Sequence, residues 1–336
     1  MNISSCRLLV LVAGSTLCLG VALLCGCAHQ PVVGRTVAID TYVNGVMAYK
    51  AGNNDQAISD LQLALRQHSD LIMAHSMLGD LYQLKRNYND ALAQYEITIR
   101  LDPYSYKNHY DEGLMDQLLG KLKEAVAAYL RALELNPQDF LSAENLGAAY
   151  LQLDDYDNAI KYCRMATEMN DKSAAAWSNL AVALEAKSQW KDAEAAWRHC
   201  LELNGSSVEV SVALAKNLKH QQRYSEARAV LSEVVRVSDT ASHRKLLGDA
   251  LFLEKKYDDA LDEYTRAVKL DPAYFPAMNE SGWVLITQYN QSLGLEEKKR
   301  LAALDAWQAS LLINPNQPQV RQLMKTYAEK FSDDNK

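Results

Sequence analysis

Residues 113–137 read GLMDQLLGKLKEAVAAYLRALELNP, and the same arrangement recurs along most of the chain. We take Ala125 as the reference position of this arrangement. A large residue, Tyr129, lies four positions after it. A small residue, Gly113, lies twelve positions before the alanine, and Pro137 lies twelve positions after it. The alanine recurs five times at intervals of 34 residues and then at 33 and 43 residues, at Ala57, Ala91, Ala125, Ala159, Ala193, Ala227, Ala260 and Ala303. A period of this length indicates an internal repeat.

Each recurring residue type has a mechanical role. Small residues suit two antiparallel helices that cross closely, because they do not hold the backbones apart. The large residue shares a helical face with the alanine and is expected to fill the space toward the next repeat. The Asp-Pro or Asn-Pro pair ends one helix and starts the next. The small residues are Gly45, Gly79, Gly113, Gly147, Ala181, Ala215 and Gly248, the large ones Tyr95, Tyr129, Trp197, Tyr264 and Trp307, and the prolines Pro103, Pro137, Pro272 and Pro315.

This pattern resembles the tetratricopeptide repeat, and the resemblance covers about Ala38 to Gln317. It implies an all-α, right-handed superhelical solenoid of about eight helix-turn-helix repeats, because a single repeat cannot bury its apolar face alone. The expected repeats are residues 38–71, 72–105, 106–139, 140–173, 174–207, 208–240, 241–274 and 275–317. Residues 318–331 are expected to form a capping helix, and residues 332–336 a disordered tail.

Two repeats depart from the pattern. The fourth has Cys163 where an aromatic residue is usual, with Tyr162 one position earlier, so we expect shifted packing there. The eighth has nine extra residues between its helices, in residues 287–300. Two interpretations of this insertion stay open, a longer solvent-exposed hairpin or a docking lip at the edge of the solenoid.

The N-terminus has the features of an export signal. Met1–Arg7 carries one positive charge. Leu8–Leu24 is an uncharged apolar run, too short and too often interrupted by Gly, Ser and Thr for a comfortable membrane span. The sequence Leu-Cys-Gly-Cys at residues 24–27 resembles the lipobox of bacterial lipoproteins, with the small Gly26 before the modified cysteine.

This second resemblance implies that residues 1–26 are a lipoprotein signal peptide and that Cys27 is lipidated, with palmitate among its acyl chains. Residues 27–37 are then the lipidated cysteine and a short tether. Ala28, rather than an acidic residue, implies sorting to the outer membrane, facing the periplasm. The alternatives are a plain signal peptide or an uncleaved membrane anchor.

Composition narrows the class of protein. The chain is 49% hydrophobic and has a formal net charge of −7, so it offers no electrostatic footprint for nucleic acid. Four of the six cysteines lie in the signal or directly after it, which leaves Cys163 and Cys200 in the body of the protein. They are expected to be buried free thiols, and a disulfide in an oxidising compartment is the alternative.

No catalytic or metal-binding pattern is present in the sequence. The seven histidines are scattered without metal-ligand spacing on one helical face, and there is no Gly-rich phosphate loop or Gly-x-Ser-x-Gly motif. The sequence therefore predicts a protein that is not an enzyme and that uses no metal ion or cofactor.

In tetratricopeptide-repeat proteins the first helices of successive repeats line a concave groove, and the resemblance places the candidate site there. Asn145 and Asn179, 34 residues apart, resemble two steps of the asparagine ladder in the repeats of O-GlcNAc transferase. A carboxamide both donates and accepts hydrogen bonds, so it can bind a peptide backbone of any sequence. The alternative is that these asparagines bond only their own helix or water.

Charged and aromatic residues accompany the two asparagines. The basic residues are Lys216, Lys219, His220 and Lys245. They predict affinity for an acidic segment or a carboxylate of a partner, unless Glu209 and Asp249 balance their charge. The aromatic residues Tyr42, Tyr110, Phe252 and Trp283 are candidates either to anchor a peptide or to pad the packing between helices.

Together these features predict a membrane-anchored scaffold or adaptor of the cell envelope. Its partners would be envelope or exported proteins that place peptide-like segments in the groove, and the membrane through the lipid anchor. Similar tetratricopeptide lipoproteins serve pilus, secretion or cell-wall machinery, so the resemblance implies one of these processes. The alternative is an enzyme-associated or glycan-handling envelope protein that uses the groove for a sugar polymer.

Overall fold

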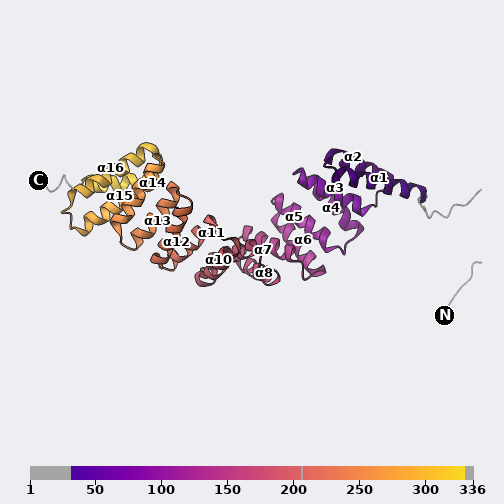
Figure 1. Cartoon of the computed structure of the whole chain (residues 1–336), viewed down its shortest axis with the longest axis horizontal. Helices are drawn as coiled ribbons and strands as arrows, with labels where there is room; N and C mark the ends of the chain where they lie inside the picture. The colour runs from indigo at the N-terminus through magenta and orange to yellow at the C-terminus, as the bar shows by residue number, and fades with distance from the viewer. Residues whose placement is uncertain (1–31, 206, 330–336) are drawn as a thin grey trace, which may run out of the picture. The chain divides into compact units, whose positions relative to one another are not determined.

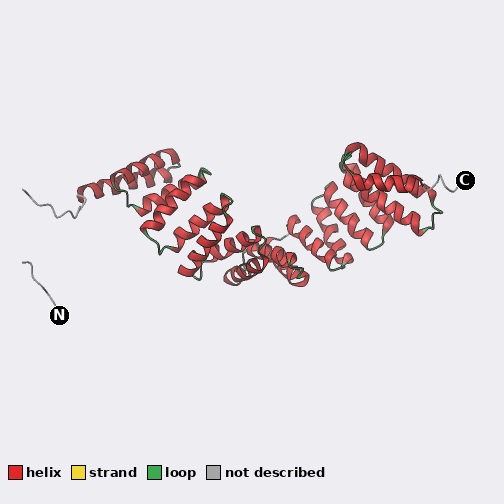
Figure 2. Ribbon diagram, turned by 180° about the vertical axis from the view of Figure 1, so that it is seen from behind, coloured by secondary structure: helices red, strands yellow, loops and turns green. Residues whose placement is uncertain are grey.

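The computed structural model describes residues 32–205 and 207–329, and within these residues every regular element is an α-helix. Figure 2 shows successive helices joined by turns and loops. The expected all-α solenoid fold is confirmed (Figure 1). The helices are α1 (Val32–Lys50), α2 (Asn54–Gln67), α3 (Ile72–Leu84), α4 (Tyr88–Leu101), α5 (Tyr106–Leu118), α6 (Leu122–Leu135), α7 (Phe140–Gln152), α8 (Tyr156–Met169), α9 (Ala174–Ala186), α10 (Trp190–Asn204), α11 (Val208–His220), α12 (Tyr224–Val237), α13 (Ala241–Leu253), α14 (Tyr257–Leu270), α15 (Phe275–Gln291), α16 (Glu297–Ile313) and α17 (Pro318–Glu329).

The chain divides into two compact units, which meet in sequence between Leu71 and Ile72. The first unit holds α1 and α2, and the second holds α3 to α17. Each odd-numbered helix from α1 to α15 is the first helix of a repeat, called here an A helix, and the even-numbered helix that follows is its B helix. The two helices of each repeat pack against each other.

In the second unit, each B helix also packs against the helix that follows it, from α4 on α5 to α16 on α17. The A helices α5, α7 and α9 contact one another in turn, and so do α13 and α15. Successive A helices therefore lie side by side, which brings side chains about 34 residues apart in the sequence onto one surface.

A steric contact inside each repeat explains the spacing of small and large residues. A Cβ atom added to Gly79 would lie 2.7 Å from Cε1 of Tyr95, and one added to Gly248 would lie 2.5 Å from Cε1 of Tyr264. The same contact joins Gly113 to Tyr129 and Gly282 to Trp307. In these four repeats the large residue packs directly against the glycine of its own repeat. It also faces the next repeat, as the sequence suggested, because Tyr95 shares a core cluster with Met115 of the third repeat and Tyr129 shares one with Leu146 of the fourth.

In the fourth repeat, Cys163 takes the place of the aromatic ring. A Cβ atom at Gly147 would lie 2.5 Å from Sγ of Cys163 and 3.1 Å from its backbone nitrogen, so α7 and α8 approach closely there. Tyr162 stacks on Tyr150, with ring centroids 5.6 Å apart and planes at 10°. Cys163 and Cys200 are both free and buried, as the sequence predicted.

The insertion in the eighth repeat lengthens both of its helices. α15 and α16 have 17 residues each, compared with 13 in α13 and 14 in α14. Leu293 and Leu295, in the turn that joins them, are almost fully exposed. The insertion is thus a longer hairpin with an apolar tip, and its use as a docking lip stays a prediction.

Candidate functional site

The candidate site lies on the A helices, where side chains from successive repeats meet. Nδ2 of Asn145 donates a hydrogen bond to Oη of Tyr110 over 3.3 Å and so joins α7 to α5. Nζ of Lys219 lies 3.6 Å from Oδ2 of Asp249 and so joins α11 to α13. We call the following side chains the A-helix surface: Tyr110, Asn145, Asn179, Lys216, Lys219, Lys245, Asp249, Glu280 and Trp283.

The two predicted asparagines are half-buried residues of successive A helices, Asn145 on α7 and Asn179 on α9. The hydroxyl of Tyr110 accepts a hydrogen bond from one N–H of Asn145. The ring of Tyr110 is tilted against that of Tyr129, with ring centroids 6.0 Å apart. The side chain of Asn179 makes no hydrogen bond with any residue that the structure describes. Each carboxamide therefore retains hydrogen-bonding groups for a partner.

The predicted lysines differ in how their charge is balanced. Nζ of Lys245 lies 3.0 Å from Oδ2 of Asp249 and 3.7 Å from Oε1 of Glu280. Oη of Tyr264 donates to the other oxygen of Asp249 over 3.0 Å. Burial alone would lower the pKa of Lys245, but Asp249 and Glu280 outweigh it and raise that pKa. Lys219 and Lys245 thus face two carboxylates, and the group has no net charge.

Lys216 is exposed on α11 and forms no ion pair within the described residues. His220, the other basic residue considered, stacks on Trp190, with ring centroids 4.3 Å apart and planes at 3°. Lys216 is therefore the lysine of the predicted basic group that keeps an unbalanced charge.

The predicted aromatic residues separate into two kinds. Phe252 packs against the core and lies 5.6 Å from the ring of Tyr257, while Tyr110 packs on the neighbouring core cluster. Trp283 is exposed and lies edge-on to Trp307, with centroids 6.1 Å apart. Tyr42, in the first unit, is half-buried. Trp283 is thus available to a partner, whereas Phe252 and Tyr110 mainly pad the helices.

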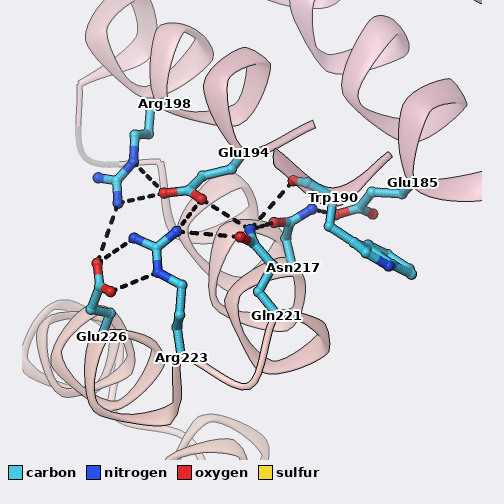
Figure 3. Close-up of polar contacts among 8 residues, drawn as sticks. All are labelled: Glu185, Trp190, Glu194, Arg198, Asn217, Gln221, Arg223 and Glu226. Atoms are coloured by element: carbon cyan, nitrogen blue, oxygen red, sulfur yellow. Dashed lines mark hydrogen bonds and ion pairs between the residues drawn. The ribbon is translucent and has the colours of Figure 1, made fainter. Parts of the chain in front are cut away.

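A polar network between the fifth and sixth repeats was not predicted (Figure 3). Asn217, which is fully buried on α11, donates to Oε1 of Glu185 on α9 over 2.8 Å. Gln221 donates to Oδ1 of Asn217 over 2.8 Å and to Oε2 of Glu194 over 2.9 Å. Other repeats have a buried residue, most often Ala, at the place of Asn217: Leu81, Met115, Ala149, Ala183, Ala250 and Val284. Aligning the repeats would have marked Asn217 as the polar exception.

Glu194 is the acceptor at the centre of this network. Its carboxylate pairs with Arg223 and lies 2.9 Å from Nη2 of Arg198, and Arg223 also pairs with Glu226 at 2.6 Å (Figure 3). Burial would raise the pKa of Glu194, but the hydrogen bonds from Gln221, Arg198 and Arg223 outweigh it and hold that pKa below its ordinary value. The network clamps α10 to α11 and α12.

We expect Glu194→Gln to make the stability of the protein less sensitive to acid. Because its folded-state pKa lies below the unfolded value, ionised Glu194 stabilises the fold at neutral pH, and this contribution is lost as the pH falls through the folded-state pKa. Burial raises the pKa of Asp111 and of Glu280. Ionisation of these two carboxyl groups therefore destabilises the fold at neutral pH, and this cost is relieved as the pH falls.

Urea unfolding of the wild type and of Glu194→Gln at about pH 7 and about pH 3 tests this. The difference between their free energies of unfolding should shrink by up to about 1 kcal/mol at the lower pH. Glu168→Gln, at an exposed glutamate of α8, is the matched control. A gap that stays constant with pH would mean that the charge of Glu194 does not stabilise the network.

A shallow pocket opens beside this network, at the turn between α9 and α10. It is lined by Ser188, Gln189, Trp190, Lys191, Asp192 and Gln221. Within the described part of the chain, no three His, Cys, Asp or Glu side chains gather as a metal site. In the same residues, no helix is both long enough and apolar enough to cross a membrane. The predicted signal peptide at residues 1–26, the predicted lipidation site Cys27 and the predicted tail at 332–336 lie outside the described residues.

Models of the tetratricopeptide repeat match residues 42–106, 142–173 and 212–275, and a further TPR repeat model matches residues 113–154. Together these matches cover more than half of the chain. The chain is a tetratricopeptide-repeat protein. The family named from the 34-residue spacing is confirmed. The matched residues include Asn145, Lys216 and Lys245 of the A-helix surface, whereas Asn179 and Trp283 lie outside them.

Solved structures of other tetratricopeptide-repeat proteins are similar. A tetratricopeptide repeat protein from Parabacteroides merdae is 17% identical over 70% of this chain and 94% of its own, with a TM-score of 0.53. PilF of Pseudomonas aeruginosa is 21% identical over 61% and 94%, and PilW, described as a widely conserved type IV pilus biogenesis factor, is 15% identical over 60% and 93%. Both have TM-scores of 0.51. Among curated proteins none matches significantly. At these identities the likeness shows the fold.

Proposed function

We propose that this tetratricopeptide-repeat protein is a membrane-anchored scaffold or adaptor of the cell envelope. It binds a peptide-like segment of an envelope or exported protein on its A-helix surface. The observation that carries the proposal is the pair Asn145 and Asn179, two carboxamides on A helices in contact, each with hydrogen-bonding groups that no described residue uses.

The surroundings of the two asparagines suit an extended segment. Leu141 and Val182 are exposed on the same two A helices, so a partner gains apolar contacts beside the carboxamides. An extended backbone presents N–H and C=O groups at regular intervals, and a carboxamide can pair with either. Lys216 adds attraction for an acidic side chain or a terminal carboxylate. Specificity then comes from the partner's apolar and acidic residues.

The lipid anchor and the process served belong to the same proposal. Cys27 after Gly26 in the Leu-Cys-Gly-Cys sequence supports lipidation, and Ala28 supports an outer-membrane location facing the periplasm. The fold shared with the pilus biogenesis factor PilW supports a role in pilus assembly, and the resemblance to tetratricopeptide lipoproteins extends the proposal to secretion or cell-wall machinery. The protein needs no catalytic group for such a role.

A sugar polymer is the second candidate ligand. The pocket at the α9–α10 turn is lined by Trp190 together with Gln189 and Asp192, and an aromatic ring next to polar side chains suits a sugar ring. His220 already stacks on one face of this ring, which leaves the other face for a sugar. The peptide proposal ranks first because Asn145 and Asn179 recur on neighbouring A helices, whereas the pocket is confined to one turn.

The test begins with partners crosslinked to the protein in intact envelopes and then purified. Asn145→Ala with Asn179→Ala should weaken binding of the purified partner by about 5- to 150-fold, the equivalent of about 1–3 kcal/mol for lost bonds to its backbone groups. Helical content should not change, because neither asparagine side chain is hydrogen-bonded to its own repeat.

The matched control is Asn89→Ala with Gln308→Ala, which removes two exposed carboxamides from the B helices α4 and α16. Lys216→Ala should slow association mainly at low salt, because its charge acts over a distance. If the control pair weakens binding and the A-helix pair does not, the partner binds the B-helix side and the proposed site is wrong.

A further inference from the structure

Helix α1 carries an exposed apolar stripe that the proposed scaffold function does not use. Ile39, Val43 and Met47 follow one another at intervals of four residues, which places them on one helical face. Their exposed fractions are 43%, 39% and 63%. We call these three side chains the α1 stripe.

The α1 stripe is open because α1 begins the array. Met47 occupies the repeat position that is buried in every later repeat, where Met115, Ala183 and Val284 are at most 1% exposed. In a stacked array those residues are covered by neighbouring helices, and terminal repeats normally need a polar outer face.

The other end of the array has such a face. α17 packs Val320 against the last helix pair, and its Arg321 and Lys325 are exposed. The chain thus caps its last repeat with a polar surface but leaves Val43 and Met47 uncovered on its first.

We propose that the α1 stripe docks into the interfacial layer of the lipid bilayer, as a second membrane contact beside the acyl chains on Cys27. This inference rests on the proposed lipid anchor. α1 begins at Val32, five residues after Cys27, so a fully extended tether spans about 17 Å at most. The anchor therefore holds the stripe next to the membrane at a high effective concentration.

A bilayer suits this face better than a second copy of the chain does. Three side chains form a patch far smaller than the roughly 800 Å² per partner that a stable protein interface buries. A bilayer needs no complementary pocket, and the tether already supplies most of the proximity. Lys50, exposed at the end of α1, can extend its ammonium group toward lipid headgroups. Docking would fix the orientation of α1 on the membrane instead of leaving it to swing on the tether.

Methionine oxidation tests the inference on the native chain. Met47 and Met73 have similar exposed fractions, 63% and 68%, so dilute peroxide should oxidise both at similar rates in water. The lipidated protein is reconstituted in vesicles of phosphatidylethanolamine and phosphatidylglycerol and oxidation is followed by peptide mass spectrometry. Met47 should then react at least about fivefold more slowly than Met73.

Substitutions in α1 separate docking from other causes of protection. Ile39→Ser with Val43→Ser should return Met47 to the rate of Met73. Leu63→Ser, at a leucine of α2 that is 41% exposed, is the matched control and should leave Met47 protected. Equal rates at Met47 and Met73 in the wild-type protein on vesicles overturn the inference.

Two further readouts identify other causes. Protection that fades when the protein is diluted in the membrane means that a second copy covers the stripe, which overturns docking into lipid. Palmitate labelling measures separately whether the protein carries the lipid anchor. A labelled protein with unprotected Met47 refutes the docking alone, whereas an unlabelled protein refutes the anchor and the docking with it.

Discussion

A protein with serine in place of Cys27 should accumulate as an unprocessed precursor and take up no labelled palmitate. The thioether to the diacylglyceryl group requires the sulfur of Cys27, so no acyl chain can be attached there. The precursor should keep residues 1–26, because cleavage of a lipoprotein signal follows modification of the cysteine. Gel mobility and palmitate labelling measure the two effects.

Cys25→Ser is the matched control for this prediction. It removes a thiol two residues away, but bulky Leu24 precedes that cysteine and makes it a poor substitute for Cys27. The control should be labelled, cleaved and membrane-bound like the wild type. If Cys25→Ser loses palmitate while Cys27→Ser keeps it, the wrong cysteine has been assigned. If both keep it, the N-terminus is not a lipoprotein signal.

Gly248→Ala should lower the free energy of unfolding by about 1–3 kcal/mol, although only one methyl group is added. That methyl would lie 2.5 Å from Cε1 and 2.9 Å from Cζ of Tyr264. The tyrosine cannot move aside easily, because it is 1% exposed and its hydroxyl is bonded to Asp249. Urea unfolding monitored by circular dichroism measures the loss.

The sixth repeat supplies a compensating change for this variant. Its natural pair at the same positions is Ala215 and Leu231, both 1% exposed. Tyr264→Leu should therefore relieve the clash of Gly248→Ala. The double variant should be more stable than the sum of the two single losses predicts, by about 1 kcal/mol or more. Additive losses would show that the glycine is not required by the ring. Ala175→Leu, at an exposed site on α9, should change stability little.

The sequence by itself determined the repeat family and its period. The reason is that the contact behind the pattern is made within one repeat, between residues such as Gly248 and Tyr264 that lie 16 positions apart. A local contact that recurs in six of the eight repeats leaves a regular trace in the sequence. Cys163 departs from the pattern of large residues, but it keeps the contact with the glycine of its repeat, because its sulfur packs against Gly147.

The candidate site was predicted only in part. Whether a side chain on an A helix is available to a partner depends on the side chains that neighbouring repeats place beside it. Asn179 and Asn217 are both asparagines on A helices. The side chain of Asn179 bonds no described residue, whereas that of Asn217 is fully buried and bonded to Glu185. The sequence left open whether Lys245 attracts a partner or is balanced by an acidic neighbour, and the structure pairs it with Asp249 and Glu280.

Sequence therefore determined which residues occupy each repeat position, and tertiary structure alone decided which of them remain available. Met47 and Ala183 share a repeat position, and one is 63% exposed while the other is 0% exposed. The sequences of the two helices alone do not account for this difference in exposure. Burial is a property of the packed array, and a side chain at the first repeat lacks the preceding neighbour that covers its counterparts later in the chain.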